Sequence, residues 1–149
     1  MQRKSGVLMH ISSLWGDYSA GAFGDEAKEW IDFISSCGFS VWQVLPFCLT
    51  DECNSPYKSY SAFSLNPNFI SLKKLYDKGL LTSDELEKAR QKTPYSCEFE
   101  RLEKERFTLL KKAGERVKNK KEIDEFISNR PHIKKFCEFM ALKTANDLK

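Results

Sequence analysis

A strand, a helix and a second strand fill the first 45 residues, and this pattern constrains the fold more than any other feature. Short apolar runs at 6–11 and 41–45 are typical of buried strands. Between them, apolar side chains recur at helical spacing and would form one buried face. These are Ala27, Trp30, Ile31 and Ile34. Two strands joined through a helix pair in parallel, so the pattern predicts an α/β fold whose sheet needs further strands.

From residue 72 onward the pattern becomes helical. Leu72 and Leu75 begin a short helix that Gly79 ends, and Gly38 has the same place after the first helix. Thr82 followed by Glu85 predicts a capping box at the start of the next helix. A longer, charge-rich helix and a last helix with the clearest apolar stripe follow. Their apolar positions are Phe99, Leu102, Leu109, Leu110, Ala113 and Val117, and then Ile133, Phe136, Cys137, Met140, Ala141 and Thr144, with Pro131 in the first turn of the last helix.

A long polar loop follows the second apolar run, which Pro46 ends, and extends to Pro67. It is rich in side chains that both donate and accept hydrogen bonds, grouped around two phenol rings. These are Asn54, Ser55, Tyr57, Ser59, Tyr60, Ser61 and Asn66. Such side chains suit a neutral, hydroxyl-rich ligand, so we expect a sugar.

Several segments, in this order along the chain, resemble the amylomaltases, which are the 4-alpha-glucanotransferases of one glycoside hydrolase family. They read SGVLMHISSL at 5–14, AGAFGDEA at 20–27, VWQVLP at 41–46, NSPYKSYSAF at 54–63, SLKKLYDKGLL at 71–81 and FCEFMALKTAND at 136–147. The resemblance covers most of the chain and is weakest between 85 and 130. Residues 47–53, which precede these loop residues, depart from the family pattern, so the outer sugar subsites could differ from those of the family.

The resemblance implies an α/β fold, the N-terminal part of a (β/α)8 TIM-type barrel followed by a mostly helical subdomain. Residues 1–71 would form the first strands, the first helix and the substrate loop, and residues 72–149 the helical subdomain. A complete barrel takes about 250 residues, with its active-site loops at the carboxyl ends of the strands. We therefore expect the partners of this segment to be a maltooligosaccharide, starch or glycogen-type glucan and the C-terminal remainder of the enzyme.

The same resemblance assigns substrate binding to Ser55, Pro56 and Tyr57, beside the bond that is cleaved. A phenol face covers the apolar C–H face of a pyranose while its hydroxyl forms a hydrogen bond. The alternative is loop packing: we favour sugar contact for Tyr57 and packing for Tyr60, and Ser55 stays open between the two.

No catalytic residue is assigned within this chain. A retaining transglycosylase needs a carboxylate nucleophile and an acid/base about 5 to 5.5 Å apart. Asp51 and Glu52 make a poor pair, because adjacent side chains of an extended loop point apart. The resemblance implies that both catalytic carboxylates come from later strands, so the 149-residue chain alone is expected to be inactive.

Neither metal nor cofactor is expected. His10 and His132 are the only histidines, and His10 reads either as a hydrogen-bonded strand residue or as a sugar contact. The five cysteines lack CxxC spacing, so reduced thiols fit better than a zinc site or disulfides. Cys48 and Cys53 could form a redox pair, but unpaired thiols are the favoured interpretation.

Charge and hydropathy exclude other classes. Residues 72–149 carry twenty Lys and Arg against fourteen Asp and Glu, but these charges alternate as on a solvated helix, so no nucleic acid is expected. The sequence has no apolar run of roughly 20 residues and no signal peptide pattern. We therefore expect a cytoplasmic protein that does not bind a membrane. The alternative function is a non-catalytic helical module that binds protein or sugar.

Overall fold

The structure is a computed structural model that describes residues 3–51 and 53–146. Contacts within the chain divide it into two compact units, and each is discontinuous in sequence. The first unit comprises Met1–Phe47 and Pro67–Arg116, and the second comprises Cys48–Asn66 and Val117–Lys149. The loop that follows the second strand therefore groups with the last two helices.

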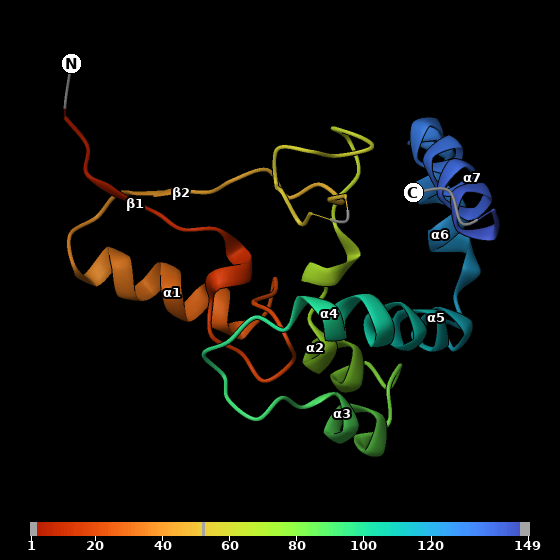
Figure 1. Ribbon diagram of the computed structural model, residues 1–149, viewed down its shortest axis with the longest axis horizontal. Helices are drawn as coiled ribbons and strands as arrows, with labels where there is room; N and C mark the ends of the chain where they lie inside the picture. The colour runs from red at the N-terminus through yellow and green to blue at the C-terminus, as the bar shows by residue number, and fades with distance from the viewer. Residues whose placement is uncertain (1–2, 52, 147–149) are drawn as a thin grey trace. The chain divides into compact units, whose positions relative to one another are not determined.

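The sheet of the first unit consists of β1 (Gly6–Leu8) and β2 (Val41–Gln43), which pair in parallel as predicted. Both strands are shorter than the apolar runs at 6–11 and 41–45, and the prediction that they are buried is wrong, because the described residues place no further strand beside them. Helix α1 (Asp25–Ser36) connects them, as Figure 1 shows. Gly6 lies opposite Val41, and a Cβ atom on Gly6 would lie 2.5 Å from the Val41 carbonyl oxygen. Only glycine allows the two strands to approach this closely at that position.

Helix α1 ends as the sequence predicts. Gly38 has a φ of +83° and its N–H donates to the Ser35 carbonyl, as in a left-handed helix terminus. The predicted buried face is only partly correct. Ala27 and Ile34 are buried, whereas Ile31 is 48% exposed and is not part of the apolar cluster that Ala27 and Trp30 join.

The core of the first unit contains two apolar clusters. The first cluster lies beside the sheet and includes two 3₁₀ turns, η1 (Ile11–Ser13) and η2 (Pro67–Phe69). Its buried residues are Ile11, Leu14, Ala27 and Phe69, with Met9, Trp15, Trp30, Trp42 and Phe47 packed against them. Gly21 is required at its edge, because a Cβ atom there would lie 2.0 Å from the Ile11 carbonyl oxygen.

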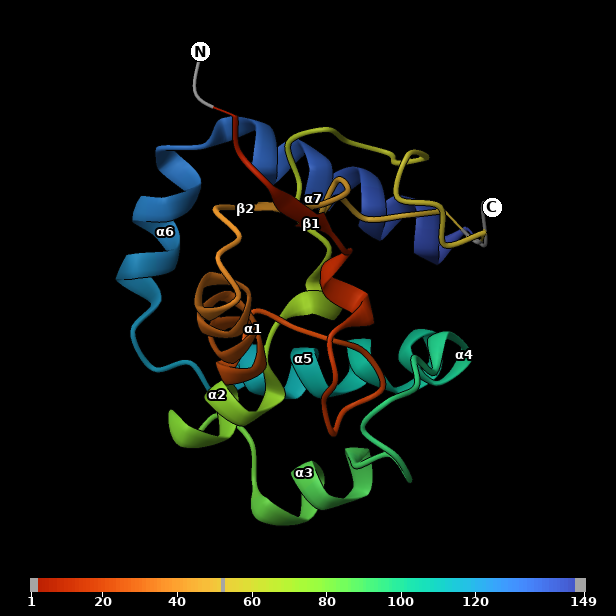
Figure 2. The same ribbon diagram turned by 90° about the vertical axis from the view of Figure 1, so that its left-hand side faces the viewer.

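The second cluster is helical. Helix α2 (Leu72–Asp77) contacts α3 (Ser83–Ala89), as Figure 2 shows, and η2 contacts α5 (Phe107–Glu115). A short α4 (Phe99–Arg101) leads into α5 through the π-helical segment η3 (Leu102–Arg106). The buried residues of this cluster are Leu72, Leu81, Ala89 and Ala113. The long charge-rich helix that the sequence predicts is therefore present, but one π-helical turn interrupts it.

Both local signals around α2 and α3 are confirmed. Gly79 has a φ of +70° just after α2, where the left-handed conformation ends a helix. At α3, the Glu85 N–H donates to the Thr82 hydroxyl and the Thr82 N–H donates to the Glu85 carboxylate, at 3.3 and 2.9 Å. These two bonds form the predicted capping box.

The second unit contains two helices besides the loop, α6 (Lys120–Ser128) and α7 (Pro131–Ala145), which contact each other. Pro131 begins α7, as predicted. The predicted stripe is only partly covered: Ile133, Phe136 and Met140 are half-buried, and no described side chain of α7 is fully buried. None of the described helices has both the length and the apolar content that crossing a membrane requires.

Candidate functional site

The two parallel strands end at the same edge of the sheet, where His10 and Pro46 meet. The His10 imidazole bonds the Pro46 carbonyl oxygen through Nε2 at 3.4 Å. Its Nδ1 accepts the Ser12 N–H at 3.4 Å, so Nδ1 carries no proton and Nε2 is the donor to Pro46. Burial lowers the pKa of His10, which favours this neutral form. His10 is hydrogen-bonded, as the first interpretation predicts, but it lies two residues beyond Leu8, the end of the strand, and not within it.

Three phenylalanine rings surround this edge. Phe69 meets the His10 ring edge to face at 5.3 Å between centroids, and Phe23 meets Phe47 in the same manner at 5.1 Å. Phe23 is 42% exposed whereas Phe69 is buried, so the group extends from the core to the surface. The carboxyl edge of the sheet is thus aromatic and holds one uncharged imidazole.

The loop at 48–66 is an irregular hairpin that closes on itself. Isolated antiparallel bridges join Cys48 to Leu65 and Thr50 to Ser59. Between them, the Lys58 ammonium lies 3.0 Å from the Asp51 carboxylate. The hydrogen bond from Lys58, together with one from the Cys53 N–H, lowers the pKa of Asp51. The Asp51 side chain is only 10% exposed, so this acid holds the hairpin tip.

The three predicted substrate-binding residues lie together at that tip. Ser55 and Pro56 are half-buried, and the Ser55 carbonyl accepts the Lys58 N–H at 3.1 Å. Tyr57 is 75% exposed, and none of the residues described by the structure bonds its hydroxyl. Asn54, just before the turn, has a φ of +54°, a left-handed conformation that asparagine tolerates well. Glu52 lies outside the described residues.

Other hydroxyl groups of the loop serve the loop itself. The Ser59 hydroxyl donates to the Leu49 carbonyl at 2.7 Å, and Ser61 accepts the Phe63 N–H at 3.2 Å and the Ser64 hydroxyl at 3.2 Å. These serines satisfy backbone groups that a hairpin of this irregular shape leaves unpaired. The abundance of hydroxyl residues in the sequence therefore overstates how many of them can face a ligand.

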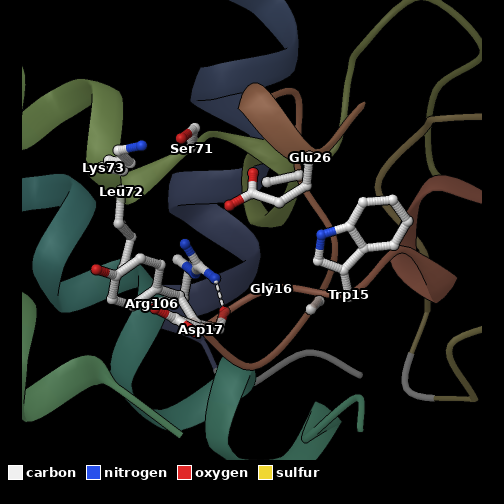
Figure 3. A pocket seen from close by; sticks show the side chains of 11 residues that line it. Trp15, Gly16, Asp17, Glu26, Ser71, Leu72, Lys73 and Arg106 are labelled. Atoms are coloured by element: carbon white, nitrogen blue, oxygen red, sulfur yellow. Dashed lines mark hydrogen bonds between the residues drawn. The ribbon is translucent and has the colours of Figure 1, made fainter. Parts of the chain in front are cut away.

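Arg106 is a structural residue that the sequence interpretation missed. It is 3% exposed, and its guanidinium donates to the Tyr18 carbonyl and, at 3.3 Å, to the Ile70 carbonyl. Figure 3 shows it beside a small cavity that Trp15 and Glu26 also line. Desolvation lowers its pKa to about 10, so it stays charged at neutral pH. One signal could have revealed it, since Arg106 falls on the apolar stripe of its helix.

Metal-binding and thiol chemistry find no support in this geometry. Within 3–51 and 53–146, no three His, Cys, Asp or Glu side chains are arranged to hold a metal ion. Cys48 and Cys53 are both free thiols, in agreement with the favoured interpretation. Burial raises the pKa of Cys97 to about 11, which makes its thiol unreactive at neutral pH.

Comparison with known proteins finds relatives that match nearly the whole chain. The family described as 4-alpha-glucanotransferase matches residues 9–149. A 4-alpha-glucanotransferase of Streptococcus pneumoniae is 39% identical over 147 residues, which cover 95% of this chain and 29% of the relative. The enzyme of Thermus thermophilus is 32% identical over 153 residues, covering 98% of this chain and 30% of the relative.

The fold agrees as well. A solved structure, the amylomaltase from Streptococcus agalactiae in complex with acarbose, superimposes with a TM-score of 0.90 at 32% identity. The match covers 99% of this chain and 31% of that protein, so the chain spans less than a third of the length of its relatives. Since the family match covers nearly all of the sequence, the chain belongs to the 4-alpha-glucanotransferases of glycoside hydrolase family 77.

Proposed function

We propose that this chain is the N-terminal segment of an enzyme that transfers α-1,4-glucan segments between maltooligosaccharides by a retaining double displacement. One observation carries the proposal: the 4-alpha-glucanotransferase family matches residues 9–149, which is nearly the whole chain. The likeness to an amylomaltase at a TM-score of 0.90 supports it. We infer the glucan substrate from the name of the relatives, 4-alpha-glucanotransferase.

The proposal extends to the architecture of the complete protein. The unit β1–α1–β2 would be the first strand–helix–strand unit of a (β/α)8 barrel, and the parallel pairing of its strands supports this assignment. Residues 1–71 would belong to the barrel and its substrate loop, and residues 72–149 to a helical subdomain beside the site. This boundary concerns the complete protein; within the present chain, α2 to α5 group with the strands.

Substrate binding is proposed for Ser55, Pro56 and Tyr57. The exposed ring of Tyr57, whose hydroxyl lacks a partner in the described part of the chain, supports this role because a pyranose could cover the ring and bond the hydroxyl. The pair Asp51–Lys58 would keep the turn in place. Both catalytic carboxylates would come from the remainder of the enzyme, which is thus the principal partner of this segment. The cytoplasmic location stays a prediction.

The decisive experiment measures disproportionation of maltotriose by the complete protein. Tyr57→Ala removes one aromatic face and one hydroxyl from the proposed site, so kcat/KM should fall by about ten- to hundredfold. Tyr57→Phe keeps the ring, so its kcat/KM should lie between that of the parent enzyme and that of Tyr57→Ala.

The matched control is Tyr95→Ala, since Tyr95 is also a strongly exposed tyrosine, 85% exposed, but lies outside the loop. Its kcat/KM should equal that of the parent enzyme. An unchanged kcat/KM for Tyr57→Ala, together with loss of activity for Tyr60→Ala, would show that the proposed loop register is wrong.

A further inference from the structure

Helix α7 contacts the substrate loop at two places within the second unit. The Tyr60 ring lies 6.3 Å from the Phe139 ring, and the Lys143 ammonium lies 4.8 Å from the centre of the same tyrosine ring. Toward the start of the helix, the Phe63 and His132 rings meet at 5.8 Å. The three helix residues are separated by seven and four positions, which places them on one side of α7.

These contacts are peripheral rather than buried. Phe63 is 78% exposed, Phe139 is 50% exposed and Tyr60 is 38% exposed. A segment held by a few half-exposed contacts opens at low free energy, so the population of its closed form responds to each contact. A cation over a tyrosine face and an edge-to-face ring pair are both directional interactions, and they therefore select one loop arrangement.

Tyr57 itself depends on its neighbours for its position. Its ring is 75% exposed and makes no ring contact or hydrogen bond with other described residues. On one side it adjoins Lys58, which pairs with Asp51, and three residues further along lies Tyr60, which α7 holds. The backbone between these two anchors has little freedom while both contacts persist.

We propose that α7 is a positioning element of the glucan site, and that Lys143 and Phe139, acting through Tyr60, hold the loop in the arrangement from which Tyr57 contacts substrate. The inference rests on the proposed function, because it assigns Tyr57 to substrate binding. It gives part of the helical segment 72–149 a specific task that concerns substrate affinity.

The test is a double-mutant cycle in the complete protein, with maltotriose as substrate. Lys143→Met removes the cation and keeps an unbranched side chain that is one atom shorter, so KM should rise about two- to fivefold with kcat little changed. Lys143→Arg, which keeps the cation, should restore KM. Lys135→Met is the matched control, because Lys135 is an exposed lysine of the same helix that makes no ion pair or ring contact with the described loop residues, and its KM should equal that of the parent.

The cycle separates positioning from general stability. If α7 acts through Tyr57, Lys143→Met should have no further effect on KM in a Tyr57→Ala background, because the positioned group is gone. Full, independent effects of the two substitutions would overturn the positioning role while leaving Tyr57 as a binding residue. An unchanged kcat/KM for Tyr57→Ala alone would instead refute the proposed site, and the positioning role with it.

Discussion

Arg106 is the described residue whose charge is most deeply buried without a carboxylate partner. Its guanidinium bonds two backbone carbonyls, those of Tyr18 and Ile70, which lie far apart in the sequence. Desolvation lowers the pKa of Arg106, which means that burial disfavours its charged form. The guanidinium nevertheless supplies the hydrogen-bond donors for the two carbonyl groups. The residue therefore ties the segment after η1 to the start of α2.

We expect Arg106→Met to lower the free energy of unfolding by about 1 to 3 kcal/mol, since two partly buried carbonyls would lose their donor. The relief of desolvation offsets part of this loss. Lys104→Met is the matched control, because Lys104 is an exposed cation of the same π-helical segment. Urea unfolding of both variants checks the expectation, and equal stabilities would contradict it.

His10 provides a second test at the residue scale. Burial lowers its pKa in the folded state below 6.5, so the unfolded chain binds the proton more readily. The stability that this residue contributes is complete above pH 6.5 and decreases as the pH falls through 6.5 toward the folded pKa. Proton NMR of His132→Gln, which leaves His10 as the only histidine, should show a midpoint below 6.5 and the Nε2–H tautomer. A midpoint at or above 6.5 would contradict this.

At the scale of elements, one carboxylate joins two helices. Glu85 caps its own helix α3 and also pairs with Arg116 at the end of α5, with an N–O distance of 2.9 Å. Arg116 in turn donates to the Leu80 carbonyl at 3.1 Å. The hydrogen bond from Arg116, and then the one from the Thr82 N–H, lower the pKa of Glu85 to about 2.

Because the folded pKa of Glu85 lies below its ordinary value, this group stabilises the fold above about pH 4.5 and the contribution disappears as the pH falls toward 2. Glu85→Gln should therefore unfold at a lower temperature at pH 7, and the difference from the parent should shrink between pH 4.5 and 2. The control is Glu103→Gln, since Glu103 makes no ion pair with any described residue. A difference that does not depend on pH would contradict the assignment.

At the scale of the whole molecule, the sheet has uncovered apolar positions. Leu8 is 57% exposed, Val41 is 41% exposed, and Val44 and Leu45 are half-buried. A sheet of two strands buries too little apolar surface to be complete, and further strands would cover these positions.

The purified 149-residue chain should release no glucose from maltotriose at any enzyme concentration or pH. The reason is that a retaining transfer needs two carboxylates about 5 to 5.5 Å apart, and the proposal places both in the remainder of the enzyme. The complete protein serves as the positive control. Robust glucose release by the chain alone, after its mass has been verified, would refute this prediction.

Local signals allowed much of the fold to be predicted from the sequence. The helix between the strands, the glycine that ends α1 and the capping box of α3 all depend on residues a few positions apart. Such interactions form from neighbouring backbone groups and need no distant partner. The loop that holds Ser55, Pro56 and Tyr57 was predicted from its polar composition, whereas the substrate-binding role of these residues is implied by the resemblance and stays a prediction.

Tertiary structure alone decided the features that join distant segments. The burial of Arg106, the exposure of Ile31 and the contact of Lys143 with the ring of Tyr60 each depend on which surfaces meet. Helical periodicity states which side chains share a face, but it does not state what covers that face. The sequence by itself thus determined where α1 and α2 end and where α3 begins, because caps and terminal glycines depend on local hydrogen bonds. Only packing between remote segments decided which side chains are buried and which contact the loop.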